Sequence, residues 1–325
     1  ILRTFVGCTA ILFGTACMGA VKYVPENMKV ELSLKVPGNN AVNYKLHPDK
    51  LENSYFDYEW RSDNKLPITV FHKVEERDSC MRLTVQLTAA QDVYFNYRQL
   101  LSTGYRHDNC QFYMPGFWYR RNLRSPKKAP SFHTSDSWLV REDRLSAPLT
   151  GIFSEKEKRF MTVNRLDDFS MDALATHKEG EIILSGKTSL GFTGFENQQG
   201  IAMLSFGFPY REAPKSYIRK LTLAPEVEAF QLMKKGESVL LTWEIMESGA
   251  DDFSDFIQHT WEHCYDTYAP KPVENSYSIA DMKQVLSCFF VNSLVDNQPL
   301  VYNSGIHLKV SDCERNGQAE VGFIG

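Results

Sequence analysis

Apolar and polar residues alternate along three stretches of the chain. Over residues 28–36 every second side chain is apolar, and the same period of two returns over residues 83–87 and 239–245. This period places apolar side chains on one face of an extended segment, which is typical of a strand with one buried side. Shorter apolar runs between these stretches are also predicted strands: Ile68–Phe71, Val93–Tyr97, Phe160–Val163, Ile182–Leu184, Ile201–Phe208 and Ile218–Leu223.

The predicted strands indicate one fold class, because no long stretch between residues 28 and 246 has a convincing helical period. Clusters of turn-forming residues separate the strands, as in residues 196–200. Many short strands joined by such turns favour an antiparallel sandwich or barrel. We therefore predict a mainly β chain in which residues 21–247 form one large antiparallel β-super-sandwich.

The apolar period changes from two to that of a helix after residue 250. The predicted helix face consists of Phe253, Phe256, Ile257 and Trp261. Asp251 and Asp252 precede this face, and acidic side chains favour a helix N-terminus. Pro270 and Pro272 then stop any helix. Residues 248–277 are predicted to be a linker helix and a proline-rich connector that belong to neither neighbouring core.

A second helix is predicted to begin at Ser278. Asp281 stands three residues later, as in a capping box with aspartate in place of glutamate. The apolar face of this helix is Met282, Val285, Leu286, Phe289 and Phe290. A third helix is expected near Asp312. Residues 278–325 are therefore predicted to begin a helical domain.

Residues 1–20 have the order of a secretory signal. Arg3 precedes an apolar run over residues 5–13, and small residues then lead to Cys17. We expect a signal peptide and export to the periplasm or outer-membrane surface of a Gram-negative bacterium. Cys17 is a candidate lipid anchor, although Gly14 replaces the usual leucine. The alternative is a short buried strand or helix. Because the chain starts at Ile1 and ends within an expected helix, we expect a fragment of a longer protein.

Composition and charge narrow the function classes. The chain is 43% hydrophobic and 23% charged, which is ordinary for a globular protein and argues against disorder. A net charge of −4 predicts no nucleic-acid partner. The cysteines after Cys17 are scattered, without a metal-ligand spacing, so we expect neither a disulfide scaffold nor a zinc site. His259 and His263 could share a helix face, but a solvated or interfacial pair is favoured over a metal site. No cofactor is expected.

One segment combines aromatic and basic residues. Nine aromatic residues lie over residues 94–119, and residues 120–144 then contain seven Lys or Arg but only three Asp or Glu. Aromatic rings stack on sugar faces, and arginine binds carboxylates through two hydrogen bonds. We predict a glycan-contacting loop, favouring an acidic sugar, whose candidate residues are Trp118, Tyr119, Arg120, Arg121, His133, Asp136 and Trp138. The alternative, given equal weight, is that the aromatics pack beneath the loop and its cations pair with nearby acids.

No catalytic motif accompanies this segment. Glu142-Asp143 and Asp167-Asp168 are adjacent acids, and neighbouring side chains in a strand point to opposite faces. They therefore cannot form the paired carboxylates of a glycosidase by themselves. The nucleophile-elbow, phosphate-loop and dinucleotide-binding patterns are absent from the sequence. The catalytic residues are unknown at this stage.

The order of signal, β module, connecting helix and helical segment resembles one family of enzymes. These are glycoside hydrolases, of the glucoamylase-like and maltose-phosphorylase types, in which a super-β-sandwich precedes an (α/α)6 toroid. The export signal resembles those of Bacteroidetes polysaccharide-utilisation enzymes. The resemblance implies a polysaccharide or oligosaccharide substrate, a sandwich that forms one wall of the pocket, and catalytic carboxylates beyond Gly325. The alternatives are a non-catalytic surface glycan-binding protein and a uronate polysaccharide lyase.

Overall fold

The computed structural model describes residues 24–51, 57–77, 80–123, 129–168, 179–219, 222–271 and 278–292. The chain divides into two compact units, Ile1–Tyr268 and Ala269–Gly325. In the first unit the described residues form strands β1 to β17 and helix α1 (Phe253–Tyr268). In the second they form helix α2 (Ile279–Asn292). The predicted signal segment and the expected third helix lie outside the described residues.

Two antiparallel sheets make up most of the first unit. One has the order β2–β1–β6–β14–β13–β9. Its strands are β1 (Met28–Lys35), β2 (Val42–Lys50), β6 (Val93–Arg106), β9 (Trp138–Arg141), β13 (Phe192–Gln198) and β14 (Ile201–Phe208). Strand β2 also pairs with β3 and joins the two sheets along one edge.

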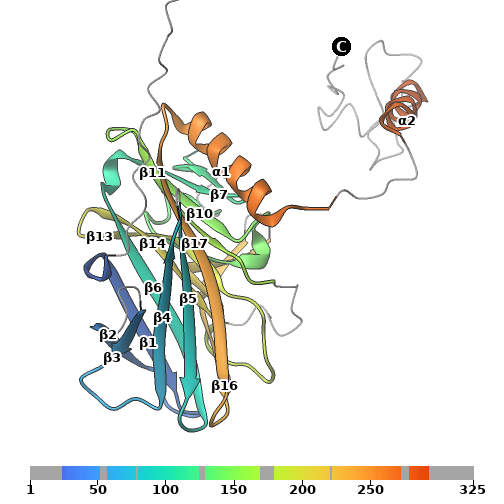
Figure 1. The fold of residues 1–325 in the computed structure, drawn as a ribbon. Coiled ribbons are helices and arrows are strands. Elements are labelled where there is room, and N and C mark those ends of the chain that lie inside the picture. The colour runs from blue at the N-terminus through green and yellow to red at the C-terminus, as the bar shows by residue number, and fades with distance from the viewer. Residues whose placement is uncertain are drawn as a thin grey trace, which may run out of the picture. The chain divides into compact units, whose positions relative to one another are not determined.

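The second sheet has the order β3–β4–β5–β17–β11–β10–β7–β8. Figure 1 labels its strands except β8. Its strands are β3 (Asp57–Arg61), β4 (Ile68–Glu76), β5 (Cys80–Ala89), β7 (Cys110–Met114), β8 (Trp118–Arg120), β10 (Leu149–Ser154), β11 (Arg159–Arg165) and β17 (Ser238–Gly249). Three further strands form a smaller group. In this group β16 (Thr222–Met233) pairs antiparallel with β15 (Arg211–Arg219) and parallel with β12 (Gly180–Ile183).

The main core lies between the two sheets, as the alternating pattern predicts. In β1, Met28, Val30 and Leu32 are buried. The ring of Phe206 in β14 lies 5.1 Å from that of Trp243 in β17, so side chains of the two sheets meet directly. Burying each such large side chain contributes about 1.5–3 kcal/mol. The prediction of a mainly β chain is confirmed.

One predicted strand is divided in the structure. The apolar run Ile218–Leu223 contains the end of β15 and the start of β16, and these two strands pair antiparallel. The run therefore contributes to two strands rather than forming one. A continuous apolar run does not by itself reveal a reversal of the chain.

Helix α1 covers the outer face of the second sheet (Figure 1). Its buried side chains are Phe253, Phe256, Thr260 and Cys264, which pack on β7, β10, β11 and β17. Asp252 caps the helix by accepting hydrogen bonds from the amides of Ser254 (2.7 Å) and Asp255 (2.9 Å). Because of this packing, α1 is part of the first unit and not a separate connector.

The capping box of the second helix is confirmed. The Ser278 hydroxyl donates to Asp281 at 2.6 Å, and the Asp281 amide donates to the Ser278 oxygen at 3.1 Å. The apolar side chains Met282, Val285, Leu286 and Phe289 of α2 are exposed. The (α/α)6 toroid stays a prediction, because most of its expected residues lie outside those described. Neither helix that the structure describes is both long and apolar enough to span a membrane.

Candidate functional site

The two tryptophans predicted to stack on a sugar lie in the core. Trp118 is 0% exposed and Trp138 is 1% exposed. Their rings lie 5.7 Å apart, and Trp118 also contacts Phe132 and Phe195. Both indole N–H groups donate to backbone carbonyls, at 2.9 and 3.0 Å. Since neither ring has an open face, these residues stabilise the fold and do not form the predicted platform.

Three of the other predicted residues lie together on the surface. Tyr119, Arg120 and Arg121 line an open groove of about 690 Å³. The other lining residues are Gln111, Asn122, Leu123 and Glu155. The groove therefore combines an aromatic ring, two guanidinium groups, two amides and one carboxylate.

The turn between β7 and β8 positions the aromatic ring of this groove. Gly116 has a φ of 76°, which favours glycine, and its amide donates to the Tyr119 hydroxyl at 3.4 Å. Tyr119 pairs with Tyr113 across the two strands, and their rings lie 5.4 Å apart. Tyr113 is buried, whereas Tyr119 is 49% exposed. One side of the Tyr119 ring is therefore supported by the core while the rest is open to solvent.

Arg120 is the exposed cation of the groove. Its φ of 56° ends β8 and interrupts the strand alternation. The guanidinium lies 5.0 Å from the centre of the Phe253 ring, a cation–π contact with the first residue of α1. Within the described part of the chain, Arg120 makes no ion pair. Its hydrogen-bonding groups are therefore available for an anionic ligand.

Arg121 has a different role from Arg120. Its guanidinium donates to the backbone carbonyls of Asp108 and, at 3.4 Å, Cys110. It also lies 5.5 Å from the centre of the Phe132 ring. These contacts tie the loop after β8 to the segment before β7. Arg121 is held as a wall of the groove and contributes its charge from a constrained position.

The remaining two predicted residues do not line the groove. The Nε2 of His133 lies 2.9 Å from the carbonyl oxygen of Leu123. Asp136 accepts a hydrogen bond from the Asn197 amide at 2.7 Å. Both side chains are exposed and connect the loop to neighbouring segments. Leu123 lines the groove, so His133 supports its wall indirectly.

The adjacent acids of the sequence are structural. Glu142 is fully buried, and its Oε2 accepts from Arg165 at 2.6 Å and from the amide of Gly191 at 2.7 Å. Burial raises the pKa of the Glu142 carboxyl against the opposing effect of Arg165. Asp143 pairs with Arg141 at 2.6 Å. Within the segment Arg141 pairs with Asp143, whereas Glu142 and Arg144 pair with Arg165 and Glu212 outside it.

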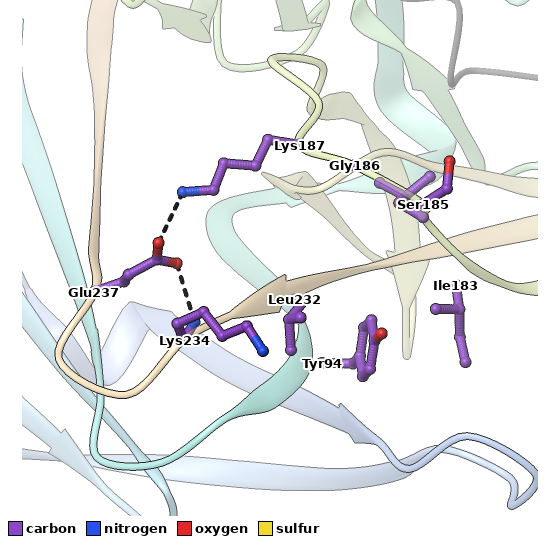
Figure 2. Close-up of a pocket in the computed structure, with 9 residues that line it drawn as sticks. Tyr94, Ile183, Ser185, Gly186, Lys187, Leu232, Lys234 and Glu237 are labelled. Atoms are coloured by element: carbon purple, nitrogen blue, oxygen red, sulfur yellow. Dashed lines mark hydrogen bonds and ion pairs between the residues drawn. The ribbon is translucent and has the colours of Figure 1, made fainter.

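A second cavity of about 500 Å³ lies where β6, β16 and the segment after β12 meet (Figure 2). Its cations are already paired. Lys187 contacts Glu237 at 3.1 Å, and Lys234 contacts Asp92 at 2.7 Å. Figure 2 also shows Glu237 accepting from the Lys234 amide, at 3.0 Å. The sequence analysis did not identify this cavity, and its neutralised charges make it a weaker candidate than the groove.

Three polar residues of the groove, Gln111, Asn122 and Glu155, were also missed. Gln111 lies in β7, and Glu155 lies in the turn after β10. Their side chains hydrogen-bond to each other, which closes one end of the lining. Nothing in a single sequence connects residues 44 positions apart. Only the antiparallel pairing of β7 with β10 brings them together.

Comparison with known proteins shows only remote similarity. No protein-family model matches the chain, and no curated protein matches its sequence. The fold is similar to that of a polysaccharide lyase, with 12% identity, a TM-score of 0.35, and coverage of 72% of this chain and 27% of the lyase.

Two further solved structures show comparable similarity. A candidate kojibiose phosphorylase from the human microbiome has 5% identity and a TM-score of 0.31, covering 81% of this chain and 27% of its own. A galactose mutarotase related enzyme from Lactobacillus acidophilus has 9% identity and a TM-score of 0.36. The match covers 68% of this chain and 80% of that enzyme. The matches thus span about a quarter of the lyase and of the phosphorylase. The descriptions of all three proteins concern carbohydrates, and the similarity extends to the fold alone.

Proposed function

We propose that this chain is the β-sandwich part of an exported carbohydrate-active protein and that its groove binds an acidic glycan. The observation that carries the proposal is the presence of an exposed guanidinium without an ion pair among the described residues, Arg120, beside a half-exposed ring, Tyr119, in one open groove. Both residues belong to β8 and are held by the short turn at Gly116.

The chemistry of the groove suits a uronic acid residue. A sugar ring has an apolar face that can stack on Tyr119, while its hydroxyl groups can hydrogen-bond to Gln111 and Asn122. A sugar carboxylate can accept two parallel hydrogen bonds from Arg120. A neutral sugar offers that guanidinium no charge of its own. The groove therefore favours acidic over neutral glycans.

The groove supports binding rather than bond cleavage. Glycoside hydrolysis uses two carboxyl groups, as acid and as base or nucleophile. Among the described lining residues, Glu155 is the single carboxylate, and Gln111 already hydrogen-bonds to it. In a glycoside hydrolase of the predicted type, the catalytic carboxylates would come from the helical domain. In that arrangement the groove holds part of the substrate.

A second candidate function is a non-catalytic surface glycan-binding protein. The same observation favours it, since a groove with one engaged carboxylate can bind a glycan without cleaving it. The two functions differ in the activity of the full-length protein. Release of reducing ends without unsaturated products identifies a hydrolase, unsaturated products identify a lyase, and unchanged polysaccharide identifies a binding protein.

The binding proposal is tested by calorimetric titration with uronate-containing oligosaccharides and their carboxyl-reduced forms. We expect the acidic form to bind at least tenfold more tightly, because a charge-assisted hydrogen bond contributes about 1.5–3 kcal/mol. Arg120→Gln should remove this preference, and Tyr119→Ala should weaken both ligands.

Arg61→Gln is the matched control, because Arg61 is an exposed arginine of β3 outside the groove. It should leave both affinities unchanged. Equal affinity of the wild-type protein for acidic and reduced ligands would contradict the acidic-glycan proposal. Unchanged binding in both groove variants would remove the groove as the site.

A further inference from the structure

Three side chains that could bind a metal converge beneath α1. They are Cys80 of β5, Glu244 of β17 and His263 of α1, and their ligand atoms all lie within 4.8 Å of one another. We propose that these residues form a binding site for a zinc-class divalent cation. The site is separate from the groove and does not depend on its function.

The sheet register explains how two of the ligands meet. Arg82 pairs with Glu244 and Cys80 pairs with Met246 across β5 and β17. Residues two apart in a strand share a face, so Cys80 and Glu244 are diagonal neighbours on one side of the sheet. This is the face that α1 covers, with Met246 and Cys80 in the same apolar layer as Phe256.

The helix supplies the third ligand. Phe256 and Cys264 face the sheet and fix the rotation of α1 about its axis. With this rotation the His263 Nε2 lies 2.7 Å from Glu244 Oε1. The Thr267 hydroxyl, one helical turn later, donates to the same oxygen at 3.2 Å. His263 is thus directed at the carboxylate by packing that involves other residues.

A charged group orients the carboxylate. Arg82 Nη2 lies 3.5 Å from Glu244 Oε2, on the oxygen that does not face His263. An interaction of this kind holds a ligand carboxylate in one orientation, and groups behind metal ligands often act in this way. Its positive charge also offsets part of the negative charge of a carboxylate and a thiolate. The other oxygen, Oε1, remains directed toward the histidine.

The donor set determines the class of metal. Thiolate, imidazole and carboxylate together suit Zn²⁺ and Co²⁺, whereas Mg²⁺ and Ca²⁺ prefer oxygen ligands alone. Three protein ligands leave one tetrahedral position for water. Cys80 and Glu244 are buried, but the side chain of His263 is 21% exposed and provides access from solvent. Binding would release the Cys80 thiol proton to solvent, so the metal is held by a thiolate.

Titration of the full chain with Co²⁺ tests this proposal. We expect one equivalent to produce the near-ultraviolet absorption of a cobalt–thiolate bond, and Zn²⁺ to abolish it by displacement. Cys80→Ser should remove this absorption. Cys288→Ser is the matched control, because Cys288 is the exposed free cysteine of α2, and it should leave the absorption unchanged.

A second pair of variants separates a metal ligand from a residue that only docks the helix. His263→Gln should weaken Co²⁺ binding at least tenfold, while His259→Gln, four residues earlier on the same helix, should not. Zn²⁺ should raise the melting temperature of the wild-type protein and of His259→Gln but not that of His263→Gln. Thiolate absorption that persists in Cys80→Ser, or its absence from the wild-type protein, would overturn the proposal. The three residues would then form only a hydrogen-bonded contact between α1 and the sheet.

Discussion

At the scale of single residues, the backbone conformation decides between core and surface. Trp118 and Arg120 stand two positions apart in β8, where strand alternation would place both side chains on one face. Trp118 is enclosed by aromatic rings, whereas Arg120 is exposed. The positive φ of Arg120 breaks the alternation and directs its side chain away from the core. A residue pattern alone does not reveal such a break, because the left-handed region is uncommon for arginine.

A buried histidine makes the stability of the protein depend on pH. His72 of β4 is fully buried, and its Nε2 lies 2.9 Å from the hydroxyl of Tyr97, which donates to Gln99 at 2.8 Å. Burial lowers the pKa of His72 from 6.5 to about 3. Its contribution to stability is therefore complete above about pH 6.5 and is lost as pH falls toward 3.

The expected effect of His72 is about 1.4 kcal/mol of unfolding free energy per pH unit within this window. Between pH 6.5 and 5, the wild-type protein should lose about 2 kcal/mol more than His72→Gln, whose side chain does not titrate. Urea unfolding at both pH values measures this difference. Equal losses in the two proteins would show that His72 has the same pKa in the folded and unfolded states.

At the scale of elements, the strands are more predictable than the orientation of the helix. Alternation identifies β1, β5 and β17 because one face of each strand meets the core. The start of α1 was also predicted, but the buried stripe includes Thr260, whereas Trp261 is 42% exposed. The rotation of a helix depends on the surface on which it packs. A large indole would not fit where the small Thr260 lies against the sheet.

Phe256 is the main contact between α1 and the sheet. Its ring lies 4.9 Å from that of Phe160 and 5.9 Å from that of Phe153. A side-chain carbon at Gly151 would lie 2.5 Å from the Phe256 ring, so this glycine leaves the space that the ring fills. Phe256→Ala should lower the unfolding free energy by about 3–5 kcal/mol, measured by urea denaturation.

Tyr265→Ala is the matched control for Phe256, because it removes an aromatic ring from an exposed position of the same helix. This change should cost less than about 0.5 kcal/mol. Similar losses in the two variants would mean that α1 does not dock through its Phe256 face. A small loss of stability in Phe256→Ala would mean that neighbouring side chains close the space left by the missing Phe256 ring.

At the scale of the whole molecule, the chain consists of a large sandwich unit and a second unit that starts at Ala269. The first unit contains the docked helix and the three buried apolar clusters of the described residues. Its core residues come from strands far apart in the sequence, such as β6 and β17. This unit therefore holds the contacts needed for independent folding.

Removal of residues 269–325 should leave the stability of the sandwich unchanged. The melting temperature of residues 1–268, measured by circular dichroism, should agree with that of the full chain within about 2 °C, which corresponds to less than about 1 kcal/mol for a unit of this size. The far-ultraviolet spectrum should lose helical signal. A large fall in melting temperature would show that the second unit packs on the sandwich.

The sequence by itself determined the β class, about half of the strand positions, the helix caps and the segment that contains most of the groove. These properties depend on neighbours within a few positions, so local periodicity and side-chain chemistry reveal them. The tertiary structure decided which aromatics are buried, which cations are paired, and which distant residues meet. Trp118 and Tyr119 are adjacent, yet the core encloses one and leaves the other half-exposed. Such differences arise because packing and ion pairing join strands that lie far apart in the sequence.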